Sequence, residues 1–155
     1  MTDRTTTHDT FVIERRYDTS VERVFAAWSN AEAKGAWFGD PAGGSRVHQL
    51  DFRVGGREHL SGTAEGGMPY RLDAMFYDII PNERIIWAYD MDFNGAHISV
   101  SLATLELHAD GDGTALTYTE YGVYLDGHDT RERREGGTHE LLDALGRFLE
   151  RPATR

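Results

Sequence analysis

The spacing of apolar and polar residues predicts one strand, two short helices and then a long run of strands. Residues 10–17 are rich in β-forming side chains and are typical of a first strand. Ser20 is a favoured N-cap residue, and the apolar residues that follow recur at helical spacing, at Val21, Val24, Phe25 and Trp28. Asn30 has the same capping character and predicts a second short helix that runs toward Trp37.

The central part of the chain has the pattern of strands joined by tight turns. Segments typical of strands cover residues 47–52, 57–64, 71–80, 84–93, 97–108 and 114–124. Turn-forming residues lie between them, at Gly55-Gly56, Pro81-Asn82, Asn94-Gly95 and 110–113. Short connections of this kind join antiparallel neighbours, so the pattern predicts a meander.

A helix with one apolar stripe ends the chain before Pro152, and its stripe contains Leu141, Leu142, Leu145, Phe148 and Leu149. An antiparallel sheet must bury one face, and this helix is the long apolar surface available to cover it. The sequence therefore predicts an α+β fold in which a curved antiparallel sheet of about six or seven strands wraps round the C-terminal helix. Because the sheet is wider than one helix, an internal cavity is expected. We expect a single domain over residues 1–155, with residues 1–9 as a disordered tail.

Composition narrows the range of partners and compartments. The 155 residues include 26 acidic and 16 basic side chains and carry a formal charge of −10, which disfavours binding to nucleic acid or to anionic membranes. There is no cysteine, which excludes disulfides, thiolate nucleophiles and cysteine-based metal sites. The polar first ten residues lack the apolar stretch of a secretory signal, so we expect a cytoplasmic protein. Lys34 is the only lysine and is interpreted as a surface residue.

Three motifs resemble parts of known metal sites, but each of them lacks features that a metal site requires. His139 and Asp143 resemble part of a zinc-hydrolase helix motif, but the helical angle places them opposite the leucine stripe, facing solvent. Residues 110–113 begin like a calcium loop without its later ligands. His48 and His59 lie in neighbouring predicted strands, where a third ligand is lacking. We therefore expect no metal and no cofactor.

The strand alternation indicates which side chains face the cavity. In residues 84–93 the odd positions are apolar, and this face is either plain core or the lining of a pocket. In the last strand the parity of Leu116 and Tyr118 carries Glu120 inward, unless a bulge near residue 121 reverses it. The helical angle brings Arg134 to the same side, so a Glu120–Arg134 contact is expected, either as a structural ion pair or as an anchor for a ligand. The predicted ligand-binding residues are Trp37, Phe52, Trp87, Tyr89, Met91, Tyr118, Glu120, Arg134 and Thr138.

Several segments, in this order along the chain, resemble a known family. Residues 20–28 (SVERVFAAW), 37–39 (WFG), 51–56 (DFRVGG) and 78–85 (DIIPNERI) are similar to the heat-shock-protein-90 ATPase activator homologue-like branch of the START/Bet v-type helix-grip (SRPBCC) superfamily. The likeness extends over about residues 11–150. Val54 stands where the family often has proline, and Gly137-Thr138 replaces a common Gly-Trp, which reshapes the cavity.

The resemblance implies a helix-grip fold with a hydrophobic pocket, in a superfamily whose members bind lipids, cyclise polyketides or assist chaperones. The sequence favours binding of an apolar or aromatic small molecule between the sheet and the C-terminal helix, with cyclase- or hydrolase-type chemistry at Glu120 as its enzymatic variant. The alternative is a co-chaperone-like module that stimulates a chaperone ATPase through its acidic surface. A third hypothesis is a homodimer formed through a sheet edge.

Overall fold

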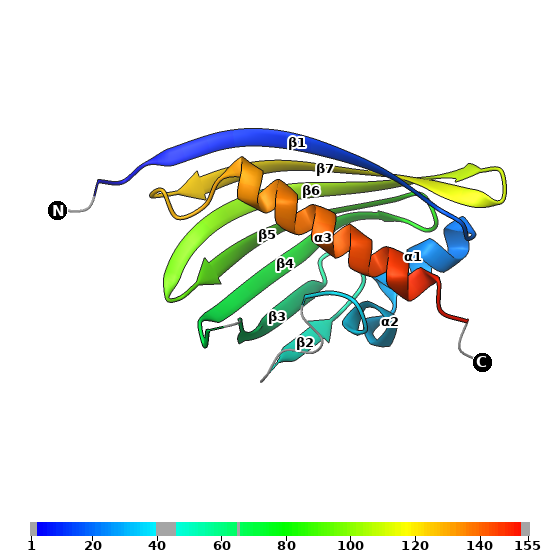
Figure 1. Cartoon of the computed structure of the whole chain (residues 1–155), viewed down its shortest axis with the longest axis horizontal. Helices are drawn as coiled ribbons and strands as arrows, with labels where there is room; N and C mark the ends of the chain where they lie inside the picture. Colours follow the sequence, from blue (N-terminus) through cyan, green and yellow to red (C-terminus); the bar gives the residue numbers. More distant parts are fainter. Residues whose placement is uncertain (1–2, 40–45, 65, 153–155) are drawn as a thin grey trace.

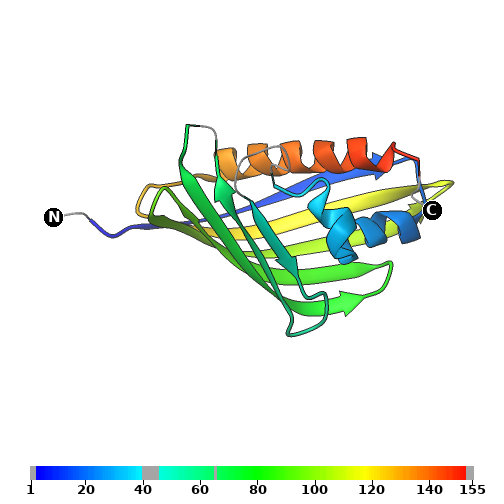
Figure 2. The ribbon, with the colours of Figure 1, turned by 90° about the horizontal axis from the view of Figure 1, so that it is seen from below.

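A curved sheet that holds one long helix against its inner face makes up the molecule (Figures 1 and 2). The computed structural model describes residues 3–39, 46–64 and 66–152. In the order of the chain the elements are β1 (Thr6–Tyr17), α1 (Val21–Ser29), α2 (Ala31–Gly35), β2 (Val47–Leu50), β3 (Arg57–Thr63), β4 (Pro69–Ile80), β5 (Arg84–Phe93), β6 (Ala96–Asp110), β7 (Gly113–Leu125) and α3 (Arg131–Leu149). The seven strands are antiparallel in the order β1-β7-β6-β5-β4-β3-β2, so the predicted α+β helix-grip fold is confirmed.

The helices begin where the capping residues predict. The Ser20 hydroxyl accepts a hydrogen bond from the Arg23 backbone N–H, and the Asn30 side chain accepts one from that of Ala33. Thr130 caps α3, which continues without a break through Gly136 and Gly137. None of the described helices is long and apolar enough to cross a membrane.

The register of β7 decides which way its side chains point. β7 pairs without a register shift with both β1 and β6, so the bulge considered near residue 121 is absent from this strand, and Glu120 stays on the inner face. Register shifts lie instead between Phe76 and Asp78 in β4 and between Met91 and Asp92 in β5. Asn94 and Gly95 both have positive φ angles, 51° and 82°, as a tight two-residue hairpin turn requires.

The first strand starts earlier than predicted. Thr6 pairs with Leu125 at the far end of β7, so residues 6–9 belong to β1, and the prediction of a disordered tail is wrong for them. The cause is the length of β7, whose backbone groups along this edge find partners in β1. Asp126, just beyond β7, accepts a hydrogen bond from the backbone N–H of Thr5 at 2.9 Å and extends the contact.

The core forms where α3 lies on the sheet. Leu142 and Leu145 are 0% exposed, and Leu149 is buried beside them. The Tyr17 hydroxyl at the end of β1 donates to the Leu142 carbonyl oxygen at 2.8 Å and fixes the helix to the first strand. His139 and Asp143 lie on the opposite, exposed side, where both contact Arg15, as the helical angle predicts.

Replacing Leu145 by alanine should lower the free energy of unfolding by about 2–5 kcal/mol, because the buried side chain leaves a cavity against the sheet. Glu140→Ala, an exposed position in the same helix, is the control and should change it by less than about 0.5 kcal/mol. Urea denaturation followed by circular dichroism measures both. Equal losses in the two variants would contradict the helix-on-sheet core.

Candidate functional site

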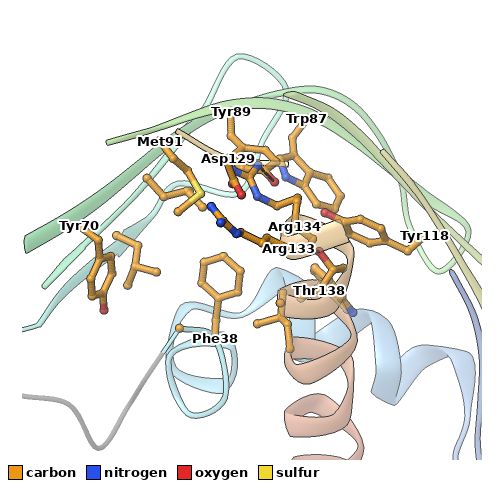
Figure 3. A pocket seen from close by; sticks show the side chains of 16 residues that line it. Phe38, Tyr70, Trp87, Tyr89, Met91, Tyr118, Asp129, Arg133, Arg134 and Thr138 are labelled. Atoms are coloured by element: carbon orange, nitrogen blue, oxygen red, sulfur yellow. Dashed lines mark hydrogen bonds and ion pairs between the residues drawn. The ribbon is translucent and has the colours of Figure 1, made fainter. Parts of the chain in front are cut away.

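A cavity of about 270 Å³ lies between α3, the inner face of the sheet and the segment after α2. Aromatic side chains make up much of its wall, namely Trp28, Phe38, Tyr70, Trp87, Tyr89 and Tyr118. Figure 3 shows Trp87, Tyr89 and Met91 side by side on one strand, facing α3. Alternation in β5 places these three on the same face, as the sequence predicts. The wall is therefore apolar over most of its area, with the polar groups gathered on the side of α3.

Two of the predicted binding residues belong to the core and not to this wall. Trp37 is 2% exposed, donates its indole N–H to the Ala27 carbonyl oxygen at 3.1 Å and packs edge-on against Trp28. Phe52 packs edge-on against Phe25 and Phe76. An aromatic residue in a mainly apolar segment fits either place, and only the tertiary structure separates the two.

Sequence reasoning missed the part of the wall that lies beside β5 in the sheet and the part that comes from the segment after α2. Leu72 and Tyr70 in β4 line the cavity, and Leu72 pairs directly with Met91 in the sheet register. Residues paired across neighbouring strands share a face, so the alternation in β4 was the signal that could have found them. Phe38 comes from the segment after α2, where no periodicity indicates direction.

Glu120 is 0% exposed and lies behind the cavity wall, where three groups bind its carboxylate. The Tyr89 hydroxyl lies 2.8 and 2.9 Å from the two carboxylate oxygens and donates to them, and the Tyr118 hydroxyl donates at 2.8 Å. Arg134 donates to Oε2 at 3.4 Å, so the predicted contact between Glu120 and Arg134 is confirmed. The carboxylate is thus enclosed by donors and separated from the cavity by two tyrosine rings.

Arg134 is equally surrounded by acceptors. Its guanidinium donates to the Tyr89 hydroxyl at 2.9 Å, to Ser99 at 2.6 Å, to Ser101 at 3.3 Å and to Asp129 at 2.9 Å. A buried charge is tolerated when its hydrogen bonds are satisfied in this way. The cluster joins β5, β6, β7 and the start of α3, and therefore fixes the helix against the sheet at one end of the cavity.

The charges in this cluster keep the tyrosines protonated. Burial raises the pKa of Tyr89 above its usual value, and the charge of Glu120 raises it further. The same two causes raise the pKa of Tyr118. Burial alone would lower the pKa of Arg134, but the neighbouring Tyr89, Glu120 and Asp129 outweigh it and raise that pKa. At neutral pH both hydroxyls therefore hold their protons and direct them at Glu120.

A second charged cluster lies behind the opposite wall, where Lys34 is 2% exposed, so the prediction of a surface lysine is wrong. Its ammonium group lies 2.7 Å from Glu58, which also binds His48 at 2.7 Å. The ammonium also lies 4.4 Å from the centre of the Phe38 ring and 5.3 Å from that of Trp28, two residues of the wall. Burial of Lys34 is possible because Glu58 neutralises it.

The histidines considered for a metal site have carboxylate partners of their own. His48 contacts Glu58, whereas His59 contacts Asp73 at 2.7 Å, so the two do not converge. No group of three or more potential metal-ligating side chains of the histidine, cysteine and carboxylate types occurs in the described ranges.

A protein-family model described as "Activator of Hsp90 ATPase homolog 1-like protein" matches residues 18–150. The chain belongs to this family. The family is part of the SRPBCC superfamily, which confirms the resemblance seen in the sequence. The search of curated proteins found no match.

Solved structures agree with this assignment. A protein of Rhizobium leguminosarum is 41% identical with a TM-score of 0.92, and the match covers 97% of this chain and 100% of that one. The Mll3558 protein of Rhizobium loti is 44% identical with a TM-score of 0.86, over 93% and 99% of the two chains. CalU16 of Micromonospora echinospora shares the fold at 20% identity, with a TM-score of 0.67 over 96% and 85%.

Replacing Glu120 by glutamine should lower the free energy of unfolding by about 1–3 kcal/mol, because the amide nitrogen cannot accept from the tyrosine hydroxyls and Arg134 loses one counter-charge. Glu14→Gln on the outer face of β1 is the matched control and should be nearly neutral. Chemical denaturation compares the two. A loss at Glu120 no greater than that at Glu14 would show that the enclosed carboxylate does not stabilise the fold.

Acid should weaken the cluster around Glu58. Burial alone would raise the pKa of Glu58, but Lys34 and the hydrogen bonds from His48 and Lys34 lower it below its ordinary value of 4.5. A depressed pKa stabilises the fold above the unfolded-state value, and this contribution is lost as the pH falls from there through the folded-state value. The free energy of unfolding should therefore decrease on acidification below the ordinary value.

A double variant isolates this effect, because Lys34→Met with Glu58→Gln removes both charges and leaves neither unpaired. Its free energy of unfolding should fall less steeply with acid than that of the native chain, whereas Glu14→Gln should follow the native slope. Denaturation curves at a series of acidic pH values give the slopes. Parallel slopes for the double variant and the native chain would contradict the assignment.

Proposed function

We propose that this protein binds an apolar or aromatic small molecule in the cavity between the sheet and α3. The observation that carries the proposal is the 270 Å³ cavity, walled by aromatic side chains and bordered by polar groups on one side. Apolar walls with a few fixed polar groups are the usual composition of small-molecule sites, and this volume lies just below their common range of about 300–1,000 Å³. A compact ligand fits best.

The hydroxyl groups on the wall favour a ligand that can donate hydrogen bonds to them. Tyr118 directs its proton at Glu120, and Thr138 directs its own at the Arg134 carbonyl oxygen at 2.9 Å. Both oxygens retain lone pairs that can accept. A hydroxyl or N–H group on the ligand would find acceptors here, which would orient the molecule along the wall.

Binding is better supported than catalysis centred on Glu120. A general acid or base must come within hydrogen-bond reach of the reacting atom. Glu120 is absent from the cavity wall, and the donors around its carboxylate are Tyr89, Tyr118 and Arg134. The chaperone alternative has the family's description and the charge of −10 as its support, with no described surface that singles out a partner.

Two adjacent glycines allow a controlled test of the cavity. Gly137 lies one helical turn from Arg133 and one from Leu141, and all three line the cavity, whereas Gly136 does not. A side chain added at either glycine meets no protein atom within 4 Å of its first carbon. Gly137→Leu therefore adds a bulky side chain at the cavity wall, whereas Gly136→Leu adds the same side chain at an exposed position outside the wall.

A panel of aromatic and aliphatic compounds should change the tryptophan fluorescence, since Trp28 and Trp87 line the cavity. Compounds that bind the native chain should bind Gly137→Leu about tenfold or more weakly, and Gly136→Leu within about twofold of the native affinity. Equal binding to both variants would place the ligand elsewhere. A panel that leaves both the fluorescence and the melting temperature unchanged would contradict the proposal.

A further inference from the structure

The charged side chains on the cavity wall differ in how far they are already neutralised. The described wall contains three of them, Asp129, Arg133 and Arg134. Arg134 has two carboxylate partners, Glu120 and Asp129, and donates to three hydroxyl oxygens as well. The donors of both terminal guanidinium nitrogens therefore have acceptors within the protein, which leaves fewer of them for a ligand.

Arg133 lies beside this cluster without joining it. The neighbouring Arg131 pairs with Glu132 and Glu135, and Arg134 pairs as above, but no carboxylate in the described part of the chain lies within ion-pair distance of Arg133. Figure 3 shows its side chain leaving α3 and extending toward Met91 on the opposite wall. An exposed guanidinium group that has no carboxylate partner among the described residues thus borders an apolar cavity.

We infer that the ligand of this cavity is a compact organic carboxylate whose apolar body lies against the aromatic wall and whose charged group is bound by Arg133. This inference rests on the proposed function and deepens it. The planar guanidinium fork of arginine matches a carboxylate with two parallel hydrogen bonds, which are stronger than neutral ones. Tyr70 and Phe38 lie around the same space and would pack against the apolar part.

The charges near the cavity raise one alternative, a cationic ligand. Glu120 and Asp129 carry two negative charges and Arg134 one positive, so the cluster is negative before Arg133 is counted, which could attract a cationic ligand. Its oxygens, however, already accept hydrogen bonds from both tyrosines, from Arg134 and from the Thr130 backbone N–H. A cation would also approach Arg133 at close range, where like charges repel.

Three probes of nearly the same shape separate these cases. Naphthoate is an anion at neutral pH, naphthamide is neutral and naphthylmethylamine is a cation. Isothermal titration calorimetry with the native chain should give an affinity for naphthoate about tenfold or more above that for naphthamide, with the amine weakest, because the charged hydrogen bond is made only by the acid.

The variants identify the residue responsible. Arg133→Gln should reduce the affinity for naphthoate to that for naphthamide and leave naphthamide within about twofold of its native value. Arg133→Lys keeps the charge without the fork and should retain part of the preference. Arg147→Gln, an exposed arginine near the other end of α3 and outside the cavity wall, is the matched control and should keep the full preference.

The outcomes separate this inference from the proposal beneath it. Equal affinity for acid and amide, a stronger affinity for the amine, or a preference for the acid that survives Arg133→Gln would overturn the inference. If Gly137→Leu still blocks binding in those cases, the cavity keeps its proposed function. Absence of binding by all three probes would overturn both.

Discussion

The structure depends on a carboxylate placed where water cannot reach it. Glu120 lies on the inner face of β7, and an uncompensated charge at that depth would be too costly for the fold. Tyr89 from β5, Tyr118 from β7 and Arg134 from α3 together supply the compensation. These donors come from separate elements, so the hydrogen bonds that they make to one carboxylate fix the position of α3 on the sheet.

This constraint also shapes the cavity. With the polar cluster holding the start of α3 and the leucines holding its end, the helix covers only part of the inner face. The uncovered part is walled by the tyrosine rings that enclose Glu120 and by Trp87 and Met91. On the opposite side, Lys34 is held by Glu58 behind Phe38 and supports that aromatic wall. Two buried ion pairs thus flank one apolar space.

The local spacing of apolar residues was enough to predict the order of strands and helices and the contact between Glu120 and Arg134. Alternation in β7 placed Glu120 inward, and the helical angle carried Arg134 to meet it, because both periods hold over the residues that separate these positions from the core. The turn at Asn94-Gly95 and the helix caps at Ser20 and Asn30 could also be predicted from the sequence, since each has a local physical cause.

Features that depend on contacts between segments far apart in the chain could not be predicted from the sequence pattern. Lys34 can be buried because it forms an ion pair with Glu58, which lies far along the chain. The sequence of the short helix α2 contains no indication of that partner. Trp37 and Phe52 are aromatic, as many residues of the cavity wall are, but they pack in the core. Arg133 and Arg134 both line the cavity, yet only Arg134 has carboxylate partners among the described residues, because the helix turns by about 100° between the two positions.

The three tryptophans of the chain allow the central claim, that a small molecule occupies the cavity, to be tested in a single experiment. Trp28 and Trp87 line the cavity, whereas Trp37 donates its indole N–H to the Ala27 carbonyl oxygen in the core. In a nitrogen–proton correlation spectrum of the labelled protein titrated with naphthoate, the indole signals of Trp28 and Trp87 should shift and that of Trp37 should move least. Three unmoved signals, or the largest shift at Trp37, would contradict the account.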